Sequence, residues 1–476
     1  MQKQASKTTI LLLMLLVLFV GMTSSLHPLA RNTSFTDSSV FILIGGSMHD
    51  GLMPYRDLFD HKGPLLYLIN YLGLFLGTVG IWVIELMFLV FAMVLCFISA
   101  RRFFDETSSL LASLATFISI IPWYVGGNLP EVYALPFMFG ALYCLMDYFT
   151  NEGKLQKKSV FIAGACMGGV LLLKANMLGL WIGLCATIFI HSLLRRKYRE
   201  VIHYVIFFLL GVTVALIPFI IWLAVRGLLG YFWEAYVLFN IRYSEVSSLM
   251  ARVDVLIQGF KIPIIFATFL TFLFMLFRKI KEMSKHEIAL TCGLLSSFLL
   301  TLLITTMGGR AFAQYYMMFI PCMIVPIAYL IDCIRKELKI RTGLLLLMIC
   351  ILFHSQLMEG VGNIRSTLSR NTFVEEVVQV VKGNTDIDDS MIVIGNTCSL
   401  YNLTGLPPAT RFPYQFPILL IDSTIKYEVR HDIRAQQPRV VVHDTRITPD
   451  VFADELEEFY QFIFENHSFR VYLCGR

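Results

Sequence analysis

Charged side chains are scarce in this chain, at 15% of its 476 residues, whereas hydrophobic residues make up 57%. The mean hydropathy of +0.68 lies outside the range of soluble globular domains and indicates a polytopic membrane protein. The sequence contains neither Cys-x-x-Cys nor His-Glu-x-x-His, which argues against a structural zinc site and against a zincin protease.

Cysteine is also uncommon outside the apolar segments. Eight of the ten cysteines lie in apolar runs, where cysteine behaves as a small hydrophobic residue. The other two, Cys398 and Cys474, lie in the C-terminal part and would be able to form one disulfide in an oxidising compartment. The sequence leaves their pairing open.

Apolar segments of spanning length recur along the first 357 residues and predict about eleven transmembrane helices. The first follows Lys3 and Lys7 and resembles a signal-peptide core, but it lacks a convincing cleavage site, so we interpret it as an uncleaved span. The predicted spans are 8–26, 80–100, 109–127, 132–149, 159–175, 176–194, 203–224, 255–277, 288–307, 315–334 and 343–357.

The distribution of charge predicts the orientation of these spans. Residues 1–357 hold 28 basic and 18 acidic residues. If the predicted spans cross the membrane alternately from a cytoplasmic N-terminus, 19 of the 28 basic residues lie in the segments on the cytoplasmic side. That asymmetry fits the positive-inside rule for a multi-pass protein of the plasma membrane with a cytoplasmic N-terminus. The basic excess therefore requires no nucleic-acid partner.

Residues 358–476 differ in character, with 11 basic and 16 acidic residues. Short apolar runs at 391–396, 439–444 and 469–474 alternate with helical patterns at 372–382, 423–435 and 449–465. This alternation predicts a small extracytoplasmic α/β domain over 358–476, following a membrane domain over 1–357.

The first outer segment, residues 27–79, gathers ionisable groups between two membrane spans. Residues 38–48 and 64–77 are too short or too polar to span and predict interfacial helices, and residues 230–243 form a similar aromatic belt. Asp37 directly precedes the first of these helices. It is interpreted either as a helix N-cap or as a general base at the lipid–water boundary.

Further charged groups lie near the predicted outer face. The run from Arg56 to Lys62 forms either a solvated loop or an anion site, and Asp57 or Asp60 would be able to hold a divalent ion such as Mg²⁺ or Mn²⁺. Glu131 is a lone acid in a short loop, either reaching water or functional. Lys174 and Arg310 are single cations that either snorkel or bind a phosphate.

These residues resemble the GT-C glycosyltransferases. The pattern comprises an acid after the first span, Pro54-Tyr-Arg-Asp57 with Asp60-His-Lys-Gly-Pro64, Asn128-Leu-Pro-Glu131, and Gly308-Gly-Arg-Ala-Phe-Ala-Gln-Tyr-Tyr316. It is similar to the bacterial family-39-like enzymes grouped with protein O-mannosyltransferases and aminoarabinose transferases. Many relatives carry Asp-Glu where this chain has Asp37-Ser38, and some carry His where Gln314 stands.

The resemblance implies an inverting transferase that uses a sugar linked to a polyprenyl phosphate and an envelope glycan, lipid or protein as acceptor. Asp37 would be the catalytic base, and Glu131 the second acid of the catalytic site. The resemblance and the charge pattern together nominate as substrate-binding residues Tyr55, Arg56, Asp57, Asp60, His61, Lys62, Lys174, Arg310 and Tyr315. No cofactor is certain from the sequence.

A lipid or polysaccharide transporter is the alternative from another class. Transporters usually place polar residues near mid-bilayer and contain inverted repeats. Here the acids lie in outer loops and no repeat is visible, which favours the enzyme.

Overall fold

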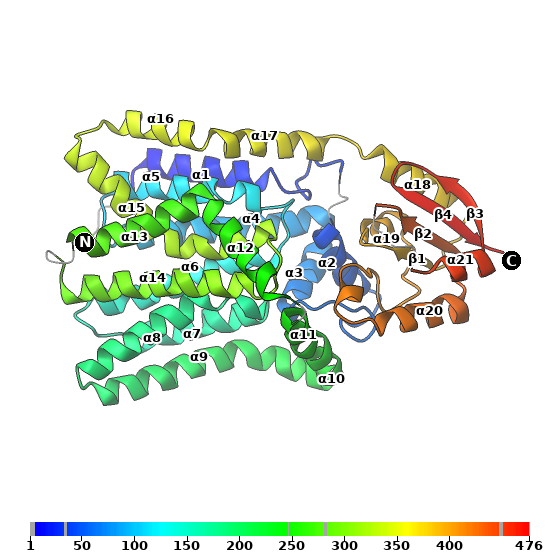
Figure 1. The fold of residues 1–476 in the computed structure, drawn as a ribbon, viewed down its shortest axis with the longest axis horizontal. Helices are drawn as coiled ribbons and strands as arrows, with labels where there is room; N and C mark the ends of the chain where they lie inside the picture. Colours follow the sequence, from blue (N-terminus) through cyan, green and yellow to red (C-terminus); the bar gives the residue numbers. More distant parts are fainter. Residues whose placement is uncertain (1–4, 33–35, 246, 280–282, 447–450, 476) are drawn as a thin grey trace. The chain divides into compact units, whose positions relative to one another are not determined.

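The computed structural model of the chain is mainly helical (Figure 1) and describes residues 5–32, 36–245, 247–279, 283–446 and 451–475. The chain divides into two compact units. The first, here called the helical unit, contains Met1–Ser24, Val83–Trp222 and Ser247–Asn363. The second, here called the mixed unit, contains Ser25–Trp82, Leu223–Val246 and Ile364–Arg476.

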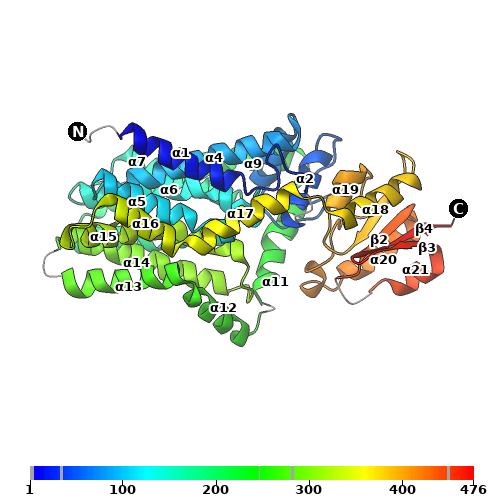
Figure 2. The ribbon, with the colours of Figure 1, turned by 90° about the horizontal axis from the view of Figure 1, so that it is seen from above.

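The helical unit consists of apolar helices that run side by side (Figures 1 and 2). Its core is aromatic in part, with Phe298 contacting both Phe272 and Phe319 edge to face. The helices are α1 (Lys7–Gly21), α4 (Gly77–Ala100), α5 (Glu106–Ile118), α6 (Pro130–Thr150), α7 (Lys157–Leu171), α8 (Gly179–Leu194), α9 (Tyr198–Val225), α12 (Leu249–Lys261), α13 (Pro263–Lys279), α14 (Lys285–Thr306), α15 (Ile320–Glu337), α16 (Thr342–Leu352) and α17 (His354–Leu368).

Among the described residues, five helices are long and apolar enough to cross a membrane, or up to seven if each bent pair forms one span. The prediction of a polytopic helical protein is therefore supported, while the count of eleven stays a prediction. Helices α1 and α8 are apolar but shorter than 18 residues.

Two predicted spans differ from single straight helices. The segment 255–277 contains α12 and α13, which meet at 82°. The break falls at Pro263, which lacks a backbone N–H and pushes Ile262 into an extended conformation. Within 109–127, α5 ends at Ile118 and a 3₁₀ turn at Ile121–Trp123 leads into an irregular loop.

The mixed unit joins the first outer segment to the C-terminal α/β fold. Helices α2 (Thr36–Ser47) and α3 (Pro64–Leu74) confirm the two short helices predicted there, and their position at the membrane interface stays a prediction. Pro64 occupies the first turn of α3, where its missing N–H costs nothing. The aromatic belt forms α10 (Leu229–Phe232), a π-helical turn at Trp233–Leu238 and α11 (Phe239–Glu245).

A four-stranded sheet organises the C-terminal part of the mixed unit. The strands are β1 (Met391–Ile394), β2 (Val440–Asp444), β3 (Tyr460–Glu465) and β4 (Phe469–Cys474), in the order β1-β2-β4-β3. Strands β1 and β2 are parallel, and the other pairs are antiparallel. Figure 2 shows α18 (Thr372–Gly383), α20 (Ile425–Gln436) and α21 (Ala453–Phe459) around the strands; α19 (Ser399–Thr404) follows β1.

The predicted α/β character of this part is confirmed, with one correction. The pattern at 449–465 predicted a single helix, but α21 ends at Phe459 and β3 begins at Tyr460. Residues 449 and 450 lie outside the described residues. Strand β3 forms because its backbone pairs with β4, as in the register of Tyr460 with Cys474.

Candidate functional site

The loop between α2 and α3 is held by its own side chains. Asp57 accepts a hydrogen bond from the Met53 N–H at 2.7 Å and a two-pronged pair from Arg56, with both contacts at 2.8 Å. The hydrogen bond from Arg56 is the main cause that lowers the pKa of Asp57. Arg56, nominated by the sequence as a substrate-binding residue, is thus paired with Asp57 within the loop.

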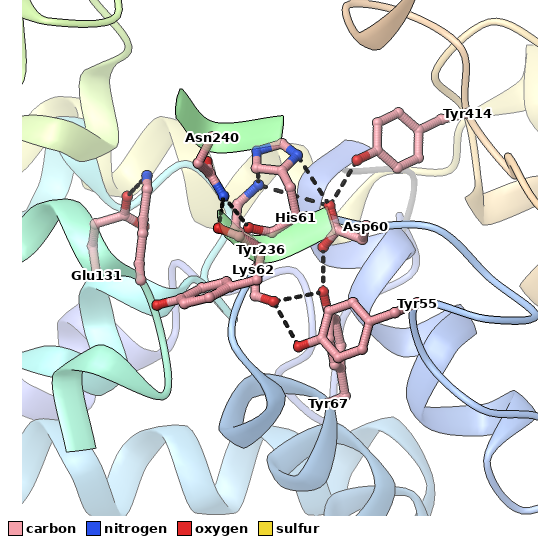
Figure 3. A network of polar contacts seen from close by, with 10 residues as sticks. Tyr55, Asp60, His61, Lys62, Tyr67, Glu131, Tyr236, Asn240 and Tyr414 are labelled. Atoms are coloured by element: carbon pink, nitrogen blue, oxygen red, sulfur yellow. Dashed lines mark hydrogen bonds and ion pairs between the residues drawn. The ribbon is translucent and has the colours of Figure 1, made fainter. Parts of the chain in front are cut away.

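Asp60 is the buried centre of this loop (Figure 3). Its side chain is 2% exposed, and its two oxygens accept hydrogen bonds from Tyr414 at 2.7 Å and Tyr67 at 2.9 Å. Burial alone would raise the pKa of Asp60, but the positive charge of Lys62, with His61 and the Tyr414 hydroxyl, lowers it overall. Asp60 is therefore a buried carboxylate with the positive charge of Lys62 close to it.

Lys62 is presented by the same network. Its Nζ lies 3.8 Å from Asp60 Oδ1 and donates to His61 Nε2 at 2.8 Å. An ammonium group has only donors, so His61 must accept through Nε2 and carry its proton on Nδ1, which faces Asp60 at 3.6 Å. The Tyr55 hydroxyl donates to the Lys62 carbonyl at 2.9 Å.

Tyr55 and His61, which the sequence nominates as substrate-binding residues, both make contacts within the mixed unit. Tyr55 is fully buried and adopts a φ of 70°, so it supports the loop from inside. The His61 ring lies near the rings of Phe239 and Tyr243, and its carbonyl accepts from Asn240 at 2.9 Å (Figure 3). Both residues therefore hold the backbone at Lys62 in place, Tyr55 through the Lys62 carbonyl and His61 through its own carbonyl.

Asp37 lies within the first turn of α2, so the interpretation as an N-cap is wrong. Phe41 follows one helical turn later on the same face, and Lys62 Nζ lies 6.0 Å from the centre of its ring. Burial and Asp60 are the main causes that raise the pKa of Tyr414 well above 10, and the charge of Asp37 adds to them. Asp37 therefore belongs to the same corner of the mixed unit as Lys62 and Asp60.

A second polar cluster lies in the helical unit. Glu131, in the first turn of α6, accepts a hydrogen bond from Lys174 Nζ at 2.6 Å, and the two side chains are 1% and 12% exposed. The same ammonium lies 4.0 Å from the centre of the Tyr315 ring. The interpretations of Glu131 as a lone acid and of Lys174 as a single snorkelling cation are therefore wrong, because the two residues form one buried pair.

Glu85, which the sequence left without a role, holds the loop that leads to Glu131. Its carboxylate is buried in α4 and accepts from the Asn128 N–H at 2.6 Å and from Ser24 at 2.9 Å. Residues 125–128 all have positive φ, and a Cβ on Gly127 would lie 2.6 Å from a Glu85 oxygen. The chain can pass Glu85 this closely only because a glycine stands there.

Three further predictions concern Arg310, the pairing of Cys398 with Cys474, and a metal ion at Asp57 or Asp60. Arg310 is half-buried in the loop between α14 and the 3₁₀ turn at Ala313–Phe319 of the helical unit. Cys398 and Cys474 are both free thiols. Asp57 and Asp60 accept hydrogen bonds from Arg56 and from two tyrosine hydroxyls, and no cluster of three metal-ligating side chains occurs among the described residues. A divalent ion at Asp57 or Asp60 stays a prediction.

Sequence reasoning missed Tyr67, Asn240 and Tyr414. Tyr414 donates to Asp60 across 354 positions of sequence, and no local spacing reports such a contact. Its segment, Phe412-Pro-Tyr-Gln-Phe-Pro417, is rich in aromatic residues and proline, and that composition was the available signal. The neighbouring Arg411 donates to the Tyr55 carbonyl at 3.0 Å, so this segment braces the loop at two points.

The fold of this chain is similar to those of several solved structures. The structure of ArnT from Cupriavidus metallidurans in the apo state superimposes with a TM-score of 0.67 at 12% identity, covering 98% of this chain and 99% of that one. The structure of ArnT from the same organism bound to undecaprenyl phosphate superimposes with a TM-score of 0.64 at 13% identity, covering 99% of this chain and 100% of that one. A third structure is that of the archaeal oligosaccharyltransferase AglB from Archaeoglobus fulgidus, in complex with an inhibitory peptide and a dolichol-phosphate. It superimposes with a TM-score of 0.54 at 13% identity, covering 99% of this chain and 74% of that one.

These likenesses confirm the GT-C fold that the resemblance implied. No curated protein sequence matches the chain. A family model does match, over residues 1–343, and that range holds the first outer segment, Glu131, Lys174 and Arg310. The chain therefore belongs to the family described as "Putative competence-induced protein Ccs4 N-terminal domain".

Proposed function

We propose that this protein is an inverting membrane glycosyltransferase that moves a sugar from a polyprenyl-phosphate donor to a hydroxyl of a cell-envelope acceptor. The reaction takes place at the outer face of the plasma membrane. The N-terminus is cytoplasmic, residues 1–357 form the membrane domain, and residues 358–476 form the extracytoplasmic domain.

The observation that carries the proposal is the support of Lys62. Its side chain is 14% exposed, and its ammonium lies beside a buried carboxylate, Asp60, which accepts hydrogen bonds from two tyrosine hydroxyls. Of its three N–H donors, one is directed at His61, which leaves donor capacity for a ligand. A lysine with this support suits a phosphate oxygen, since the ammonium acts as a compact positive charge.

Asp37 supplies the complementary chemistry. Its carboxylate takes the proton of the acceptor hydroxyl as that oxygen attacks the anomeric carbon. The bond from the anomeric carbon to the phosphate oxygen breaks, and its electron pair leaves with the lipid phosphate, whose negative charge Lys62 stabilises. A single displacement inverts the anomeric configuration, and no second carboxylate has to protonate the leaving oxygen.

The structural relatives support a lipid-linked donor. One ArnT structure contains undecaprenyl phosphate, and one AglB structure contains a dolichol-phosphate together with an inhibitory peptide. Both share the fold of this chain, so a polyprenyl phosphate is the natural donor class to test.

The experiment uses the full chain in liposomes with a radiolabelled polyprenyl-phosphate sugar. A transferase releases the label from the lipid and attaches it to an acceptor added as envelope extract. Transbilayer movement of the donor with its sugar still attached, and no transfer, would instead favour the transporter and contradict the proposal.

A further inference from the structure

A cavity of about 320 Å³ lies in the helical unit among α6, α7, α8 and α9, and no residue placed in the chemistry above lines it. Its wall is apolar, with Cys185 and Ala186 contributed by α8 and Val205 and Phe208 by α9. The one hydroxyl of the lining, that of Tyr204, already accepts from the Leu155 N–H at 3.0 Å and donates to Glu200 at 3.2 Å. The cavity therefore suits a hydrocarbon chain and offers little to a polar ligand.

The cavity follows from how α9 packs. Helix α9 touches α7 backbone to backbone, since a Cβ on Gly164 would lie 2.1 Å from the Phe208 carbonyl and one on Gly211 would lie 2.0 Å from the Phe161 carbonyl. Small residues permit this close approach between membrane helices. Lining residues come from both α8 and α9, so the cavity is the space left between those two helices.

The polar ends of these helices are strongly basic. Lys157 lies at the start of α7, and its Nζ is 5.2 Å from the centre of the Phe207 ring on α9, close to the lining residues Leu155 and Phe208. The segments 151–158 and 195–200 that flank the cavity hold two acidic residues, Glu152 and Glu200, against seven basic ones. The basic residues are Lys154, Lys157, Lys158, Arg195, Arg196, Lys197 and Arg199.

We infer that this cavity binds one acyl chain of an anionic phospholipid, with the lipid phosphate at the basic rim formed by Lys157 and its neighbours. The apolar wall accounts for the chain, and the charge of the rim accounts for the preference over a zwitterionic lipid. The basic segments are those that the charge asymmetry assigns to the cytoplasmic side, so the lipid comes from the inner leaflet. This inference does not depend on the proposed transferase activity.

Native mass spectrometry of the delipidated full-length protein tests it. Phosphatidylglycerol and phosphatidylcholine with identical acyl chains are added in turn, and we expect saturable retention of one phosphatidylglycerol at several-fold lower concentration. Equal retention of both lipids would overturn the inference. So would displacement by soluble glycerol phosphate, which has the head-group charge without the chain, or by undecaprenyl phosphate at lower concentration than phosphatidylglycerol.

Two variants, each with a matched control, test the apolar wall and the basic rim separately. Ala186→Trp fills the cavity from an exposed position on α8 and should abolish retention, whereas Val214→Trp on the exposed face of α9 should not. Lys157→Gln should weaken retention about five-fold, the effect of one lysine near an anionic lipid, whereas Lys7→Gln, at an exposed position at the start of α1, should leave it unchanged. Melting temperatures confirm that each variant is folded. A folded Ala186→Trp variant that retains the lipid as wild type does would contradict the assignment.

Discussion

Removing the Tyr414 hydroxyl is the sharpest perturbation of the network around Lys62. In Tyr414→Phe, Asp60 keeps Tyr67 on one oxygen but loses the 2.7 Å hydrogen bond on the other. A hydrogen bond to a charged group contributes about 1.5–3 kcal/mol, and Asp60 is too buried for water to replace it freely. We therefore expect the free energy of unfolding to fall by about that amount.

The same variant should change the dependence of stability on pH. The pKa of Asp60 in the folded protein lies below its ordinary value near 3.8, because Lys62, His61 and the Tyr414 hydroxyl together outweigh the effect of burial. A lowered carboxylate pKa contributes stability above the unfolded-state value, and that stability is lost as the pH falls through the folded-state pKa. Without Tyr414 the folded-state pKa of Asp60 rises towards its unfolded-state value. The loss of stability in acid should then become smaller and end at a higher pH, while its onset, which the unfolded-state pKa sets, stays the same.

Denaturant unfolding of the purified protein in detergent, measured at pH 7 and through the acid range, provides the assay. Tyr427→Phe is the matched control, because Tyr427 is 68% exposed on α20 of the same unit. A loss below about 0.5 kcal/mol at pH 7, or an equal loss in the control, would refute the account of Asp60 as a carboxylate held by Tyr414.

Three further variants test the remaining contacts. Lys62→Gln should raise the apparent donor KM at least ten-fold, as expected when a charged hydrogen bond of about 1.5–3 kcal/mol is lost, and unchanged donor affinity would remove it from the phosphate site. Lys174→Met should destabilise the protein by about 3–5 kcal/mol, because it leaves Glu131 buried and unpaired; the added change Glu131→Gln should recover part of that loss in the same unfolding assay. Glu85→Leu should raise amide hydrogen exchange at Asn128, whose N–H loses its acceptor, and exchange as slow as in wild type would contradict this reading of the loop.

The sequence predicted much of the architecture, because hydropathy and strand alternation act over short distances. The helices in the first outer segment and strands β1, β2 and β4 coincide with their predicted ranges to within a few residues. The break at Pro263 was missed because hydropathy averaged over a window is insensitive to one residue that lacks an N–H. Strand β3 was missed because its backbone pairing with β4 overrode the helical pattern over Phe459–Glu465.

The composition of the candidate site was predicted better than its contacts. Charged groups in a hydrophobic chain are conspicuous, so Asp37, Asp60 and Lys62 stand out in the sequence. Their partners do not, because Tyr67 and Tyr414 are ordinary residues until the fold brings their hydroxyls to Asp60. Pairing of Glu131 with Lys174 was hidden for the same reason, since the two lie in separate loops 43 positions apart.

The central claim is that Asp37 is the base, and its direct test is transfer of a labelled sugar by Asp37→Asn. Asparagine keeps the size of the side chain but cannot accept the proton at neutral pH, so we expect the transfer rate to fall by about 10²–10⁴ while donor binding is retained. The matched control, Asp50→Asn, replaces an exposed acid just beyond the end of α2 and should transfer as wild type does. A folded Asp37→Asn protein that transfers sugar at the wild-type rate would contradict the account.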